Sequence, residues 1–278
     1  MRLGVSSYAF NWWAGVPGYP PRDPLTPERL LDIALELGVD VVQIADNLPL
    51  DNFPAPRLDG LAARARAAGI AIEIGARSVD RGHLRRQLEI ARRLDAHLIR
   101  TLIDRDQDDA IGALREIAPD LASSGITLGI ENHDRFRAAS FRHIVEQARS
   151  SAIGIVLDTA NSLGCGEDLD TILSQLAAYT VNLHVKDCQA RRLPYLKGFT
   201  ITGTPAGKGM IDIPKALAAI PPRVNCILEL WSEPLDTVEE SIARENEWAR
   251  ESVAYLRPLI GCISERVPEA SAKPFPRP

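Results

Sequence analysis

Cysteine is scarce in this sequence of 278 residues, which contains only four: Cys165, Cys188, Cys226 and Cys262. They lie far apart and form no CxxC pair, and four are too few to cross-link a chain of this length. We therefore expect reduced thiols and a cytoplasmic protein.

Long apolar runs and blocks of like charge are also missing. No stretch reaches the length of a membrane span, and the opening MRLGVSSYAF is typical of a strand, not of a secretory signal. The 32 Lys and Arg against 37 Asp and Glu give a net charge of -5 without a basic cluster that could hold a phosphate backbone. We therefore expect no attachment to a membrane and no binding to nucleic acid.

Short apolar segments recur along the chain and alternate with amphipathic stretches. Eight of them are rich in Val, Ile and Leu: RLGVSSY, VDVVQIADN, IAIEIGAR, AHLIRTLI, ITLGIEN, IGIVLDTAN, TVNLHVKD and VNCILELW. Eight strand-helix units predict an α/β fold, a (β/α)8 TIM barrel over residues 1–262, followed by a Pro-rich tail over 263–278. A doubly wound open sheet is the competing architecture, but no GxGxxG motif follows the first strand.

Polar side chains stand near the carboxyl ends of the last four predicted strands: Glu131, Asp158, His184 and Glu229. We call these four residues the strand-end set. Alternate residues of a barrel strand face the interior, and active sites lie at the carboxyl ends, so the set is expected to converge. Three partly buried carboxylates would repel one another by on the order of several kcal/mol, a cost that a divalent cation removes. Oxygen and imidazole ligands favour Mn²⁺, with Mg²⁺, Co²⁺ or Zn²⁺ as alternatives.

Three cationic side chains share the inward parity, namely Arg77, Arg100 and Lys186. So much positive charge exceeds what a neutral sugar needs, which indicates a carboxylate or phosphate on the substrate. Two alternatives stay open. Arg77 or Arg100 could neutralise Glu73 or Asp104, or the cations could pair with the strand-end set in an ordinary salt-bridge network.

Two further residues are candidate substrate ligands. His133 follows the fifth strand with inward parity, although a capping or loop role fits equally well. The segment GTPAGKG is predicted to be a flexible lid beside the seventh strand, from which Lys208 would reach the substrate.

The motifs GIEN, VLDTAN, NLHVKD, GTPAGKGMIDIP and ILELW, in this order and spacing, resemble the xylose isomerase-like TIM barrel family of sugar isomerases and epimerases. The resemblance implies that the strand-end set holds one divalent metal and that Glu131 and Glu229 act as acid and base on opposite faces of the substrate. It also implies a sugar or sugar-acid substrate and a homodimer or homotetramer. The family's epimerases usually carry a histidine where this chain has Asn161, which makes Asn161 a candidate substrate ligand.

A metal that chelates two vicinal oxygens of a hydroxy-ketone stabilises the enediolate formed when a proton is lost. Our leading prediction is therefore a metal-dependent sugar or sugar-acid isomerase or epimerase. The alternative is a lyase on the same scaffold, either a dehydratase or a decarboxylase of a 3-oxo sugar acid such as 3-oxo-isoapionate. An AP endonuclease is more remote, because that branch uses additional histidines and this chain has five in total. A sugar-binding protein without catalysis is a third class, which the intact strand-end set disfavours.

Overall fold

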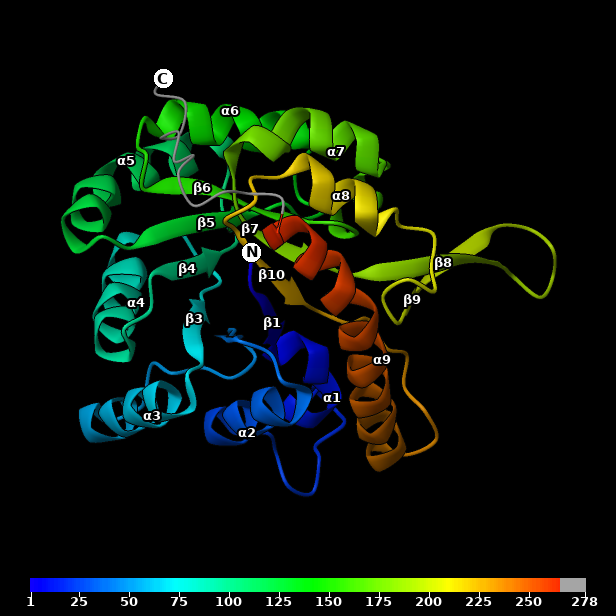
Figure 1. The fold of residues 1–278 in the computed structure, drawn as a ribbon. Coiled ribbons are helices and arrows are strands. Elements are labelled where there is room, and N and C mark those ends of the chain that lie inside the picture. Colours follow the sequence, from blue (N-terminus) through cyan, green and yellow to red (C-terminus); the bar gives the residue numbers. More distant parts are fainter. Residues whose placement is uncertain (266–278) are drawn as a thin grey trace.

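Eight parallel strands close into a barrel at the centre of the computed structural model, which describes residues 1–265 (Figure 1). They are β1 (Leu3–Ser6), β2 (Val41–Ile44), β3 (Ala71–Gly75), β4 (Leu98–Thr101), β5 (Thr127–Glu131), β6 (Ile153–Asp158), β7 (Thr180–Val185) and β10 (Asn225–Leu228). Neighbours around the barrel follow the chain order, and β1 closes the ring against β10. The predicted strands and the predicted barrel are confirmed.

Helices surround the barrel and connect its strands (Figure 1). They are α1 (Asn11–Ala14), α2 (Pro27–Leu37), α3 (Ala55–Ala68), α4 (Arg81–Leu94), α5 (Gln107–Ser124), α6 (Ala138–Ala148), α7 (Leu169–Leu176), α8 (Ile213–Ala219) and α9 (Val238–Glu265). The ends of α2 illustrate local control by sequence. Thr26 accepts a hydrogen bond from the backbone N–H of Arg29, and Gly38 ends the helix at φ 66°, a conformation that glycine adopts without strain.

Each strand separates its side chains between two environments. In β2 and β3 the aliphatic residues Val42, Ile44, Ile72 and Ile74 are at most 3% exposed and belong to the apolar core of the protein. Burying each such side chain stabilises the fold by roughly 1.5–3 kcal/mol. The alternate positions face the barrel interior, and there the chain carries polar groups.

A buried polar layer crosses the barrel interior and is centred on Glu73. The Glu73 carboxylate accepts hydrogen bonds from the side-chain amides of Gln43 at 3.1 Å, Asn182 at 2.9 and 3.0 Å, and Asn225 at 2.7 Å. These amides come from β2, β7 and β10. Burial raises the pKa of Glu73 despite the four hydrogen bonds that stabilise its ionised form.

An antiparallel hairpin leaves the barrel after β7 and projects from it (Figure 1). It is formed by β8 (Asp187–Arg192) and β9 (Phe199–Thr204). The predicted lid therefore needs correction, since its first two residues, Gly203 and Thr204, belong to β9. The turn after β9 is fastened to Asp187, whose carboxylate accepts the backbone N–H groups of Gly207, Gly209 and Ile211.

The chain end differs slightly from expectation. Helix α9 continues to Glu265, three residues beyond the predicted end of the barrel domain, and the rest of the predicted tail, 266–278, lies outside the described residues. Within residues 1–265, none of the helices combines the length and the apolarity that crossing a bilayer requires.

Candidate metal centre and active-site cavity

A cavity of about 340 Å³ opens at the carboxyl ends of the strands. Its walls combine charged groups with aromatic and aliphatic ones. The lining includes Tyr8, Trp12, Arg77, Leu102, His133 and Trp231. This is the position at which barrel enzymes bind their substrates.

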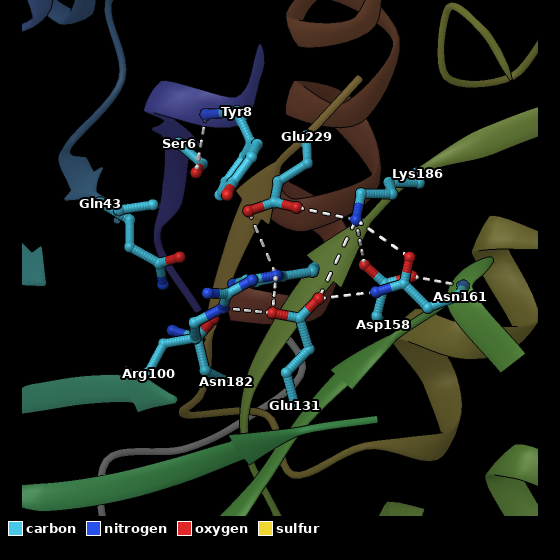
Figure 2. A network of polar contacts seen from close by, with 12 residues as sticks. Ser6, Tyr8, Gln43, Arg100, Glu131, Asp158, Asn161, Asn182, Lys186 and Glu229 are labelled. Atoms are coloured by element: carbon cyan, nitrogen blue, oxygen red, sulfur yellow. Dashed lines mark hydrogen bonds and ion pairs between the residues drawn. The ribbon is translucent and has the colours of Figure 1, made fainter. Parts of the chain in front are cut away.

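The strand-end set converges at this cavity. Its four residues are at most 1% exposed, and each offers one ligand atom within 4.8 Å of the others. Figure 2 shows the two glutamates and Asp158 directed toward a common centre. The structure thus brings together the residues that strand parity predicted to meet.

Asp158 is held rigidly by the backbone around it. Its Oδ1 accepts the backbone N–H groups of Ala160 and Asn161 at 2.9 and 2.8 Å. Its own N–H donates to Asn132 Oδ1 at 2.7 Å. One carboxylate oxygen is therefore committed to the loop after β6, which leaves Oδ2 directed toward the other members of the set.

Arg100 is buried between two carboxylates, with 3% of its surface exposed. Its Nε donates to Glu131 Oε2, and its Nη1 donates to Asp46 Oδ1 at 2.8 Å. Burial by itself would raise the pKa of Glu131, but Arg100, with help from His184 and Lys186, holds that pKa well below its usual range. Arg100 therefore orients Glu131 and keeps it ionised.

Lys186 places its ammonium group among the carboxylates (Figure 2). The Nζ atom lies 2.9 Å from both Asp158 Oδ2 and Glu229 Oε2, and 3.9 Å from Glu131 Oε1. It also donates to Asn161 Oδ1 at 3.2 Å. Burial would raise the pKa of Glu229, yet His184 and Lys186 hold it well below its usual value.

His184 completes the set and has no well-aligned hydrogen bond to any described residue through either ring nitrogen. Its Nδ1 lies 3.3 Å from Glu229 Oε1, an atom that also lacks a hydrogen-bond donor. Burial would lower the pKa of His184, but Glu229 and Glu131 outweigh it and raise the pKa to about 10. Unpartnered nitrogen and oxygen atoms in a buried, carboxylate-rich cluster fit a divalent cation.

The other sequence-predicted residues divide into two groups. Arg77, His133 and Asn161 line the cavity, where Asn161 Nδ2 donates to Glu131 Oε1 at 2.6 Å. Lys208 lies elsewhere, since its Nζ pairs with Glu251 on α9 and the residue does not line the cavity.

Both arginines pair with Asp46, and neither pairs with Glu73 or Asp104. Arg100 also pairs with Glu131, which is the ion pair with the strand-end set that the sequence left open. Arg77 Nη1 lies 3.3 Å from Asp46 Oδ2 and Arg100 Nη1 lies 2.8 Å from Asp46 Oδ1. Asp104 instead bonds to Ser78 and Arg105, and Glu73 to the amides of the polar layer.

Two residues at the site, Asp46 and Glu245, lacked a distinct sequence signal, and of these only Glu245 lines the cavity. Asp46 anchors both arginines and accepts the Tyr8 hydroxyl at 2.9 Å. Burial and the Asp46 carboxylate raise the pKa of Tyr8. Glu245 on α9 is 1% exposed and accepts the backbone N–H of Trp12 at 3.1 Å and the Ser232 hydroxyl at 3.1 Å. Helical periodicity could have placed Glu245 on the inner face of α9, but not at a cavity.

Comparisons with known proteins agree with this architecture. A model of the xylose isomerase-like TIM barrel family matches residues 31–259. The chain belongs to this family. It is 33% identical over 266 residues to the 3-oxo-isoapionate decarboxylase of Pectobacterium atrosepticum, covering 92% of this chain and 95% of that protein.

Solved structures show the same fold. D-psicose 3-epimerase with D-tagatose from Clostridium cellulolyticum H10 matches with a TM-score of 0.71 and 19% identity, covering 94% of this chain and 99% of that one. A xylose isomerase-like TIM barrel protein from Mycobacterium smegmatis in complex with magnesium matches with a TM-score of 0.68 and 14% identity, covering 93% and 97%. The family therefore contains enzymes, and the buried strand-end set of this chain could bind a metal.

Proposed function

We propose that the protein is a divalent-metal-dependent lyase that decarboxylates a 3-oxo sugar acid. This is the alternative reaction weighed from the sequence. The observation that carries it is the pairing of both glutamates with cations. Arg100 holds Glu131 ionised, and His184 and Lys186 do the same for Glu229.

Ion pairing makes the two glutamates poor proton acceptors. Isomerisation and epimerisation begin when a base removes a proton next to a carbonyl, and such a base works best with a pKa near the operating pH. Both glutamates have a pKa well below their usual range. Decarboxylation needs no base, because the carbon–carbon bond itself supplies the electron pair. The extensive similarity to 3-oxo-isoapionate decarboxylase supports the same choice.

The strand-end set would hold the metal, which supplies Lewis acidity toward the substrate carbonyl. Mn²⁺ is our first choice and Mg²⁺ the second, given the three carboxylates and one imidazole. Both cations that pair with the glutamates would stay in place during the reaction and keep the ligands ionised.

Arg77 is the cation best placed to orient the substrate carboxylate. Its side chain is 69% exposed at the cavity mouth, and its Nη1 contact to Asp46 Oδ2 measures 3.3 Å. Leu102 and Trp231 give the same cavity apolar surface, which favours conversion of a charged carboxylate into neutral CO₂. As CO₂ leaves, the bonding electrons move toward the ketone oxygen, and the carbon that carried the carboxylate takes up a proton. Water that reaches the cavity supplies that proton, because Lys186 stays paired with Asp158 and Glu229.

The test is an incubation of the Mn²⁺-loaded protein in D₂O with a panel of 3-oxo sugar acids and ketoses, followed by proton NMR and CO₂ detection. Release of CO₂ with deuterium at the carbon that lost it supports the proposal. Asp158→Asn should abolish the release, whereas Lys215→Gln, which removes an exposed ion pair to Asp170, should not.

Sugar isomerisation or epimerisation is the second candidate, because both glutamates line the cavity together. Appearance of an isomer with deuterium exchange next to the carbonyl, and without CO₂, would replace our proposal with that reaction. We place either reaction in the cytoplasm, on the basis of the cysteine usage.

A further inference from the structure

Glu245 is a buried carboxyl group in the cavity wall that the proposed reaction does not use. It lies on α9 and lines the cavity, although only 1% of its surface is exposed. Within residues 1–265 no cationic side chain pairs with it, and burial raises its pKa to about 8. Burying a carboxyl group without a charged partner costs stability, so such a group in a cavity is a candidate for a functional role.

One oxygen of Glu245 joins two walls of the cavity. Oε1 accepts the backbone N–H of Trp12, on α1, at 3.1 Å and the hydroxyl group of Ser232, in the segment after β10, at 3.1 Å. Trp12 and Ser232 both line the cavity, and the Trp12 indole N–H donates to the Ser232 carbonyl oxygen at 3.0 Å. Oε1 is therefore committed to contacts within the protein.

The other oxygen is less committed. Within the described part of the chain, the hydrogen-bond donor to Oε2 is the same Trp12 N–H, at 3.1 Å, which Oε2 shares with Oε1. The backbone N–H groups of Asn11 and Trp13 also lower the pKa of Glu245. An ionised carboxylate oxygen accepts two hydrogen bonds, and a protonated one also donates one. Oε2 therefore keeps hydrogen-bonding capacity for a ligand in the cavity.

The partner of Oε2 should be a neutral hydroxyl group. A carboxylate or phosphate of the substrate would repel the ionised form of a buried carboxyl group. A hydroxyl group donates to the ionised form and accepts from the protonated form, so it fits both. The substrate carboxylate is assigned to Arg77, whose partner is Asp46 and not Glu245. The two ends of the substrate would thus have different binding groups in one cavity.

We propose that Glu245 is a substrate-binding residue that forms a hydrogen bond through Oε2 with a hydroxyl group of the sugar chain. The inference rests on the proposed function, because it takes the substrate to be a sugar acid whose carboxylate binds Arg77. Glu245 excludes that carboxylate from its own part of the cavity and so determines which end of the substrate reaches Arg77. Trp12 and Ser232 hold the Glu245 side chain in place for this contact.

The test measures binding of D-gluconate to the Mn²⁺-loaded protein by isothermal titration calorimetry. D-gluconate has a carboxylate and hydroxyl groups but no ketone, so it binds without losing CO₂. Glu245→Met should raise its dissociation constant about tenfold. Glu245→Gln should bind like the wild type, because its carbonyl oxygen can keep both contacts of Oε1 and its amide can replace Oε2. The matched control is Glu247→Met, at an exposed position of α9, which should also bind like the wild type.

Further measurements separate substrate binding from structural damage. Glu245→Asp keeps the carboxyl group but shortens the side chain, so it should also weaken the binding of D-gluconate. Neither Glu245→Asp nor Glu245→Met should change the affinity for Mn²⁺, because the contacts of Glu245 lie outside the strand-end set. Acetate, which has a carboxylate but no hydroxyl group, should bind equally to the wild type and to Glu245→Met.

Three results would overturn the inference. They are a wild type that does not bind D-gluconate, undiminished binding by both Glu245→Met and Glu245→Asp, and an equal loss in Ser232→Ala. The last substitution removes a contact of Oε1 alone, so an equal loss would mean that Glu245 acts only by joining the cavity walls. Because CO₂ release is measured separately, D-gluconate binding as expected without decarboxylation of any 3-oxo sugar acid would overturn the proposed function and leave this inference standing.

Discussion

Lys186 Nζ lies 2.9 Å from Glu229 Oε2 and equally close to Asp158 Oδ2, so an ammonium group neutralises carboxylates that are also candidate metal ligands. Removing that charge should strengthen cation binding, because the site then carries one more uncompensated negative charge. We expect Lys186→Met to bind Mn²⁺ about tenfold more tightly or better, measured by isothermal titration calorimetry. Lys215→Met, on the surface, should bind like the wild type. Weaker binding by Lys186→Met would show that the lysine supports the metal instead of opposing it.

Arg100 should be essential for stability as well as for the site. Arg100→Met leaves Glu131 buried without its guanidinium partner, and we expect the free energy of unfolding to fall by about 3–5 kcal/mol. Urea denaturation measures this change. The matched control is Arg85→Met, which breaks an exposed pair with Asp120 and should cost about 1 kcal/mol or less. Equal effects of the two substitutions would contradict the role assigned to Arg100.

Glu245 should make stability depend on pH. Burial raises its pKa to about 8 in the folded chain, from the ordinary value of 4.5 for a solvated glutamate. Between these values the folded chain holds a proton that the unfolded chain has released, so this contribution is full below pH 4.5 and is lost as the pH rises to about 8. Glu245→Gln should remove roughly 2–4 kcal/mol of this dependence. Urea denaturation of the wild type and of Glu245→Gln at pH 4.5 and at about pH 8 measures this difference. An equal change in the stability of both proteins between these pH values would refute the role of Glu245.

Gly203 should be irreplaceable at the base of the hairpin. Its backbone approaches Trp231 too closely for a methyl group, so Gly203→Ala must displace the hairpin and should cost about 1–3 kcal/mol. Faster proteolysis within residues 193–198 and a shifted tryptophan emission would report the displacement. Gly60→Ala in α3 is the control, because a Cβ there meets nothing within 4 Å and alanine favours the helix. Identical proteolysis of both variants would argue against this close contact.

The alternation of side chains along each strand was the most informative feature of the sequence, because it predicted which residues face the barrel interior. In segments such as ITLGIE, the aliphatic residues must face the helices, which turns Glu131 inward without further information. The same reasoning correctly turned Arg100 inward, but it could not identify Asp46 as its partner. Asp46 follows β2 in a loop, and only barrel closure brings the two side chains together.

Tertiary contacts decided the features that the sequence left open. The segment FTITGT alternates with period two, as a strand does, but its apolar side chains are exposed. The glycines of the following segment GTPAGKG led to the prediction of a loop instead. Glu245 lies on a long amphipathic helix. Its carboxylate contacts Trp12, which is distant in sequence, and Ser232, which lies in the loop before the helix. The hydrophobic periodicity of a helix predicts which of its faces is buried, but not which residues that face contacts.

The polar layer around Glu73 has a consequence for how the barrel assembles. Gln43 pairs in register with Glu73, and Asn225 pairs in register with Asn182, so the carboxylate joins two pairs of adjacent strands that flank β1 in the ring. A slip of one residue in either pair would turn its amide outward. The buried Glu73 carboxylate would then lose a hydrogen-bond donor. The same slip would also turn the aliphatic side chains of that strand inward, so both patterns favour one register. The Glu73 layer therefore favours the correct strand alignment as the ring closes, through side chains that do not line the cavity.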